Sequence, residues 1–157
     1  MNATEILAVL AVVTGGLAAG MTVDRSIVAL PAWRHLNVEA WAAFSRYADL
    51  GNGLYLYPAV GVSTWLLSMA TAVVYTVQAG PSEAAAVVYA AAVVALIPVF
   101  ATTRAVPNML KVRHTDDDAQ LMTAFAGFQK WNNVRAVGQT LGFALNVWAL
   151  VLLLLHS

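Results

Sequence analysis

The chain contains no cysteine, and this absence excludes several kinds of chemistry together. Without a thiol, its 157 residues form no disulfide, thiolate metal site, cysteine-held iron–sulfur cluster or cysteine nucleophile. Histidine is also scarce: there are three, His35, His114 and His156, and no two have the short helical spacing of a metal-binding pair. A metal site would require His35 and His114 to meet across two loops, so we expect no bound metal.

Charged residues are also few. Only 10% of the residues are charged, and eight basic against eight acidic residues give a formal net charge of zero. Nucleic-acid binding requires a basic surface that meets the phosphates, and no basic stripe is present. Because 61% of the residues are hydrophobic, the chain is too apolar for an ordinary soluble domain. The composition therefore predicts a protein that partners a lipid bilayer and does not bind nucleic acid.

What the chain does contain is four long uncharged runs, over residues 6–23, 54–77, 84–102 and 136–155. Each is long enough to cross roughly 30 Å of hydrocarbon as a helix with a rise of about 1.5 Å per residue. Gly80 and Pro81 separate the second run from the third, which makes those two an antiparallel pair. We therefore predict one all-α domain over residues 1–157, an integral membrane four-helix bundle.

The basic residues predict how this bundle is oriented. All eight lie in or beside the two long polar segments 24–53 and 103–135: Arg25, Arg34, Arg46, Arg104, Lys111, Arg113, Lys130 and Arg135. Because cytoplasmic loops of membrane proteins carry an excess of Lys and Arg, both segments are expected in the cytoplasm. The N- and C-termini are then expected on the non-cytoplasmic side.

The two polar segments themselves have helical periodicity. In 37–50, Trp41 and Phe44 fall opposite the charged positions, as on an amphipathic helix. In the second segment Leu121, Phe125 and Phe128 share one apolar face. We predict two interfacial amphipathic helices in the cytoplasmic loops.

The fourth run and its approach carry a polar stripe. Trp131, Arg135, Gln139, Gly142 and Asn146 are spaced by 4, 4, 3 and 4 residues, which places them on one helical face. Unsatisfied polar groups cost several kcal/mol each in hydrocarbon, so the stripe should point into the bundle. Two interpretations remain open: hydrogen bonding between helices, or a pocket that opens towards the cytoplasm and is lined by Arg135 and amides.

Other polar groups lie at the same boundary. They are Asp49, Asn52, Tyr55 and Tyr57 before and within the second run, and Asp24, Arg25, Thr103 and Arg104 at the ends of the first and third. Each alone is typical of a residue at headgroup level or of a local ion pair. Their convergence from all four helices favours a binding site.

Glycine and proline add two further expectations. Gly16 with Gly20, and Gly138 with Gly142, form Gly-x-x-x-Gly pairs that permit close helix packing. They favour packing within the bundle, with a homo-oligomer as the alternative. Pro58 and Pro98 lie within predicted helices, where they favour kinks that could shape a cavity.

Several segments together resemble the anthrone oxygenase-like family of small four-helix membrane proteins. They are Leu30-Pro31-Ala32-Trp33-Arg34, the segment Ser45-Arg46-Tyr47-Ala48-Asp49-Leu50-Gly51-Asn52-Gly53, Tyr57-Pro58, Trp131-Asn132-Asn133-Val134-Arg135, Gln139 and Asn146-Val147-Trp148. The resemblance implies oxidation of an anthrone to an anthraquinone by O₂, without flavin or haem, in a bacterial plasma membrane. Tyr47 departs from the family, in which a histidine is expected at that position.

The resemblance also implies roles for individual residues. Asp49 would be the base that deprotonates the substrate, and Arg135 with Asn133 would hold the resulting oxyanion. A flat aromatic substrate would reach the site laterally from the bilayer and contact the remaining candidate residues: Trp41, Tyr55 and Trp131 by stacking, with Asn52, Gln139 and Asn146. The alternatives are a non-enzymatic accessory subunit or small-molecule binder, and after these a transporter.

Overall fold

The computed structural model describes residues 1–78 and 83–155, and the secondary structure in this part of the chain is entirely helical. Four continuous helices span Ala3–Leu36, Val38–Gln78, Glu83–Lys111 and Asp118–Leu155, and each is long and apolar enough to cross a membrane. The all-helical, four-helix architecture predicted from the hydrophobic runs is confirmed. The predicted break at Gly80 and Pro81, like His156, lies outside the described residues.

Three of the four helices are divided by local changes in geometry. The first consists of α1 (Ala3–Asp24), the π-helical η1 (Arg25–Ala29) and α2 (Leu30–Leu36). The second consists of α3 (Val38–Phe44), the π-helical η2 (Ser45–Asn52) and α4 (Gly53–Gln78). The third consists of α5 (Glu83–Val94) and α6 (Leu96–Lys111), and the fourth is the unbroken α7 (Asp118–Leu155).

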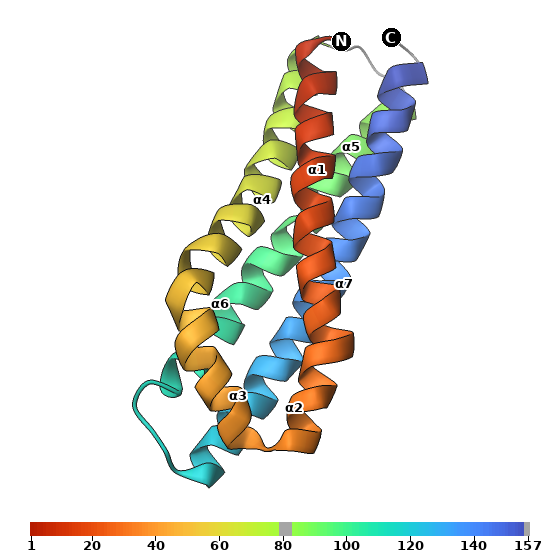
Figure 1. The fold of residues 1–157 in the computed structure, drawn as a ribbon. Coiled ribbons are helices and arrows are strands. Elements are labelled where there is room, and N and C mark those ends of the chain that lie inside the picture. The colour runs from red at the N-terminus through yellow and green to blue at the C-terminus, as the bar shows by residue number, and fades with distance from the viewer. Residues whose placement is uncertain (79–82, 156–157) are drawn as a thin grey trace.

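The helices form a bundle in which α1 packs on both α4 and α7, and α7 packs on α5 and α6 (Figure 1). The start of α1 and the end of α7 lie at one end of the bundle, which we call the terminal end (Figure 1). The turn between α2 and α3 and the connection from α6 to α7 lie at the other end, called here the basic end (Figure 1). The segments that contain the Lys and Arg residues run towards this basic end.

Small residues let the helices approach closely. A Cβ added at Gly138 of α7 would lie 2.7 Å from the Cγ2 atom of Ile97 on α6, a distance too short for two carbons. At Gly142, one turn further along, the nearest atom outside its own helix would be Val94 Cγ1 at 3.9 Å. Gly138 therefore allows the close α6–α7 contact, which supports the internal-packing interpretation of this glycine pair.

The two segments predicted as interfacial helices are helical, but they are not separate helices. Residues 38–52 run directly into α4, and residues 118–135 are the first half of α7. Their apolar faces pack on each other inside the bundle, where the Trp41 ring lies 5.1 Å from Phe125 and 5.8 Å from Phe128 between centroids. The prediction of two separate interfacial helices is therefore wrong: amphipathic periodicity does not specify what covers the apolar face, and here the two apolar faces bury each other.

Arg46 closes the basic end of the bundle. Its Nη2 atom lies 2.5 Å from the Asp116 carboxylate and donates to the Thr115 carbonyl at 2.8 Å, and its Nε donates to the Val112 carbonyl at 3.0 Å. One side chain of η2 thus holds the connection between α6 and α7.

Candidate functional site

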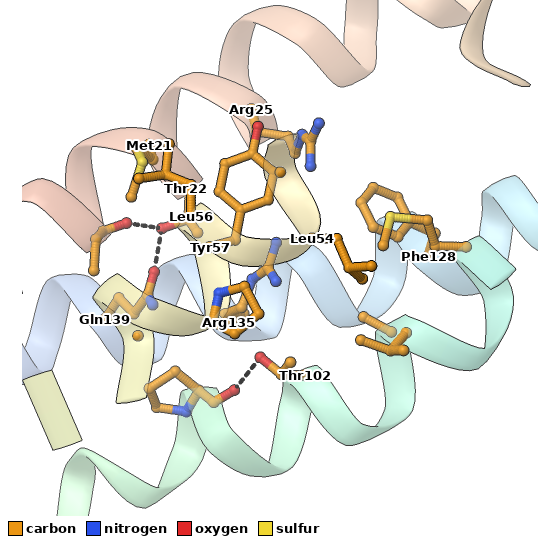
Figure 2. A pocket seen from close by; sticks show the side chains of 18 of the residues that line it. Met21, Thr22, Arg25, Leu54, Leu56, Tyr57, Thr102, Phe128, Arg135 and Gln139 are labelled. Atoms are coloured by element: carbon orange, nitrogen blue, oxygen red, sulfur yellow. Dashed lines mark hydrogen bonds between the residues drawn. The ribbon is translucent and has the colours of Figure 1, made fainter. Parts of the chain in front are cut away.

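A cavity of about 460 Å³ lies in the basic half of the bundle, between α1, α4, α6 and α7 (Figure 2). Most of its wall is apolar. The polar side chains that line it are Thr22, Asp24, Arg25, Tyr57, Thr102, Thr103, Arg135 and Gln139. Its size and its few convergent polar groups are typical of a site for a lipophilic small molecule.

Two prolines help to explain why the bundle is hollow there. Pro98 has no N–H to donate to the carbonyl of Val94, and α5 ends at Val94 while α6 begins at Leu96. Pro58 lies inside α4, and both prolines line the cavity. The interruption predicted at Pro98 therefore lies at the cavity wall, whereas α4 continues unbroken through Pro58.

Arg25 and Asp49 form a buried ion pair beside the cavity. Arg25 is the first residue of η1 and Asp49 lies in η2, so each partner is carried by a π-helical segment, a geometry that recurs at functional sites. Asp49 is 0% exposed, and its second oxygen accepts from the Ser45 hydroxyl at 3.1 Å. The charge of Arg25 is thus balanced by a carboxylate.

The Arg25 guanidinium is also enclosed by aromatic rings. Its Cζ lies 5.3 to 5.8 Å from four ring centroids, those of Trp33, Phe44, Tyr57 and Phe128. Each is within the range of an attractive cation–π contact. Together with Asp49, these rings fix the guanidinium in one place.

Arg135 has a different environment. Its Nη2 lies 2.5 Å from the Asn132 side-chain oxygen, and the Asn132 amide nitrogen donates in turn to Ser26 Oγ at 2.9 Å. Within residues 1–78 and 83–155, Arg135 has no ion-pair partner, and its buried Nε has no hydrogen-bond acceptor. The charge of this half-buried side chain is not balanced by an ion pair in the described structure, so an anion bound in the cavity would be stabilised at Arg135.

Further along α7 the polar stripe turns from lining the cavity to joining helices. Gln139 lines the cavity, and its side-chain oxygen accepts from Thr22 Oγ on α1 at 2.7 Å (Figure 2). Asn146 is buried deeper in the bundle and donates to Ser68 Oγ on α4 at 3.1 Å. Both interpretations of the stripe therefore apply, each at its own depth.

The structure brings only part of the predicted site together. Of the nine candidate residues, Arg135 and Gln139 line the cavity, and Asp49 lies behind Arg25. Trp41 is fully buried in the aromatic core, and Trp131 packs edge-on against Phe100 at 5.8 Å. Neither tryptophan is among the described residues that line the cavity.

Three predicted residues face away from the cavity, and their neighbours take the inner positions. Asn52 and Asn133 are exposed, and Tyr55 is 77% exposed. Asn132 is fully buried beside Arg135, and Tyr57 lines the cavity (Figure 2). The expected placement of Asn52, Asn133 and Tyr55 towards the ligand thus differs from the structure.

Sequence signals for the inner residues do exist. Asn132 precedes Arg135 by three residues and Gln139 by seven, which is the helical spacing of the stripe itself. Arg25 follows Ala18 and Thr22 on the small-residue face of α1 that packs inward. The predicted oxyanion role of Asn133 rests on the family resemblance and not on this spacing.

Among the described residues, no group of three or more metal-ligating side chains is placed to hold a metal ion. No protein-family model, curated protein or solved structure matches this chain.

Proposed function

We propose that the chain is a membrane oxidoreductase that binds a flat, lipophilic anthrone in the cavity, stabilises the anion formed from it and oxidises that anion with O₂, as anthrone oxygenases do. The observation that carries the proposal is a largely apolar cavity of about 460 Å³ that contains Arg135, which has no ion-pair partner among the described residues. The apolar wall suits aromatic rings, and Arg135 suits an oxygen that becomes negative during the reaction. The four helices cross the bilayer with the basic end in the cytoplasm.

The reaction needs a base, a cation and O₂. A base removes one proton from the ring CH₂ group of the anthrone, and the electron pair left on carbon delocalises onto the carbonyl oxygen, which Arg135 stabilises. O₂ adds to that carbon and takes up a proton, which gives a hydroperoxide. Loss of water from the hydroperoxide leaves the second ketone of the anthraquinone, so that CH₂ and O₂ become C=O and H₂O.

Asp24 is the base in this proposal, and Asp49 is a positioning residue. The Asp49 carboxylate is bound by Arg25 and Ser45 and does not reach the wall of the cavity in the described structure. Asp24 lines the cavity and is exposed, so it can return a proton to water. Asp49 instead fixes Arg25, whose charge adds to the field that favours an oxyanion.

The departure at Tyr47 bears on activity. Tyr47 is 86% exposed and is not among the described residues that line the cavity. Replacing histidine by tyrosine there removes no group from the cavity wall, so the proposal does not depend on that histidine. A second candidate function, binding without chemistry, is favoured by the same cavity: its apolar wall and Arg135 suffice to bind an anion, and the carboxylate of Asp49, the base that the resemblance implies, is held by Arg25.

The test is O₂ uptake by purified protein in lipid nanodiscs with an anthrone, measured above the protein-free rate, together with the affinity for a hydroxyanthraquinone. Asp24→Asn should lose about 10²-fold or more in rate and retain binding, since that is the usual contribution of a general base. Binding without any oxidation by the wild type would leave the non-enzymatic function. Absence of both binding and oxidation would overturn the proposal.

A further inference from the structure

The bundle is closed on three sides of the cavity and loosely closed on the fourth. At the terminal end α4 packs on α5, where Ala72 and Tyr75 form a buried cluster with Ala84 and Val88. Towards the basic end α4 and α6 have only sparse contact, whereas α1 packs closely on α4 and α6 closely on α7. The cavity lies at this level, and both α4 and α6 contribute to its wall.

Side chains on this fourth side line the cavity and are exposed at the same time. On α4, Leu56 is 53% exposed and Val62 is 46% exposed, although both line the cavity. On α6, Thr103 is likewise exposed and lines it. A single layer of side chains therefore separates the cavity from the outer surface between α4 and α6.

This layer is apolar in effect, including its two threonines. The Thr102 hydroxyl donates to the Pro98 carbonyl and the Thr103 hydroxyl to the Phe100 carbonyl, each at 2.7 Å. Hydroxyls bonded to their own helix present little free hydrogen-bonding capacity to a passing molecule. The opposite wall carries Arg135, so the cavity has a charged inner side and an apolar outer side.

We infer that the cavity is filled from the lipid phase, through a portal between α4 and α6 formed by Leu54, Leu56, Pro58, Val62, Thr103 and Val106. The ligand is an amphipathic anion that lies with its acidic oxygen at Arg135 and its apolar body towards the portal. This rests on the proposed function in one respect, that the cavity holds a lipophilic ligand. It does not depend on oxidation.

The first test needs no ligand. Because the chain has no cysteine, Val62→Cys gives a single attachment point for a nitroxide spin label, at a portal residue inside the second apolar run. In lipid vesicles, a portal to the bilayer predicts that the label collides more with O₂, which concentrates in lipid, than with a water-soluble nickel complex. A label at His114→Cys, in the exposed connection, should show the reverse preference. Greater access of the nickel complex at position 62 would overturn the inference.

The second test blocks the portal. Val62→Trp should slow the association of 1,8-dihydroxyanthraquinone from vesicles about tenfold, as expected for a barrier raised by about 1.4 kcal/mol. Val73→Trp is the matched control, since Val73 is exposed on the same helix and is not among the described lining residues. Lateral entry also predicts that the wild-type rate follows the mole fraction of ligand in the lipid.

The outcomes separate this inference from the proposed function. An unchanged association rate in Val62→Trp, or a rate that follows the aqueous ligand concentration, would overturn lateral entry even if oxidation occurs. A single-chain fatty acid, used as a second probe, distinguishes a lipid acid from a ring-shaped anion as the ligand. Competition by the fatty acid with the hydroxyanthraquinone indicates a lipid acid, and no competition indicates a ring-shaped anion. Competition by the uncharged fatty alcohol at equal strength would overturn the anionic class.

Discussion

Arg25 binds Asp49 across two helices, and the guanidinium of Arg25 lies among four aromatic rings. The pair is buried, so each charge depends on the other. Removing one partner of such a pair leaves a buried charge without compensation, which is more costly than the pair itself is stabilising. This contact joins the two π-helical segments and places Arg25 at the cavity wall.

Asp49→Asn should therefore destabilise the protein by about 3–5 kcal/mol, measured by unfolding in detergent. The matched control is Asp116→Asn, which removes the carboxylate of the surface pair with Arg46 and should cost about 0–1 kcal/mol. The double variant Arg25→Gln/Asp49→Asn should be more stable than the sum of the two single effects predicts, because neither charge is then left alone. If the destabilisation of the double variant equals the sum of the two single effects, the two charges do not stabilise each other.

Arg135→Gln should weaken binding of an ionised hydroxyanthraquinone about tenfold or more, because the ligand loses its charge-assisted hydrogen bond. Lys130→Gln removes a cation from the exposed face of the same helix and should leave the dissociation constant unchanged. Affinity is measured by tryptophan quenching in nanodiscs. Equal affinity of wild type and Arg135→Gln would leave Arg135 with a structural role only.

Gly138→Ala should destabilise the bundle by about 1–3 kcal/mol, since the added methyl would overlap Ile97 and Pro98 on α6. Gly142→Ala adds the same atom one turn away, where 3.9 Å is an ordinary contact, and should be close to neutral. Thermal unfolding of the two variants in one detergent gives the comparison. Equal melting temperatures would show that the α6–α7 contact is looser than the structure has it.

Asn146→Leu should leave the fold intact and cost little, because hydrogen bonds between membrane helices contribute on average about 0.6 kcal/mol. A double-mutant cycle with Ser68→Ala isolates the contact between α7 and α4. A coupling energy well above about 1.7 kcal/mol would exceed the range for such pairs and indicate a wider network.

A reporter fused after Ser157 should be non-cytoplasmic, and one inserted at Asp117 should be cytoplasmic, as the distribution of Lys and Arg predicts. Paired alkaline phosphatase and green fluorescent protein fusions measure the two locations. A cytoplasmic C-terminus would reverse the proposed orientation and would move the cavity to the outer half of the membrane.

The four helices follow from the sequence because backbone groups in an apolar run must bond within the helix. The polar face of α7 also follows from the sequence. The 3.6-residue period places Arg135, Gln139 and Asn146 on one side of the helix, independently of the residues that they contact. Pro98 in a helical run likewise predicted an interruption of the helix, which the structure has just before it, at Ala95.

Only the tertiary structure decided which of two close neighbours faces the cavity. Successive side chains of an α-helix point in directions about 100° apart. The local helix geometry therefore decides whether Asn132 or Asn133, and Tyr57 or Tyr55, faces the cavity. In η2 the wider i→i+5 bonding alters that angle just before Tyr55 and Tyr57.

The pairing of Arg25 with Asp49 is also tertiary. It joins residues 24 positions apart, and the sequence offers Asp49 a closer basic neighbour in Arg46. Arg46 is held instead by the connection from α6 to α7, which leaves Asp49 to Arg25. The sequence determined that polar groups converge at the basic end. Which of them pair, and that Arg135 remains without a partner for its charge in the described structure, was decided by how the helices pack.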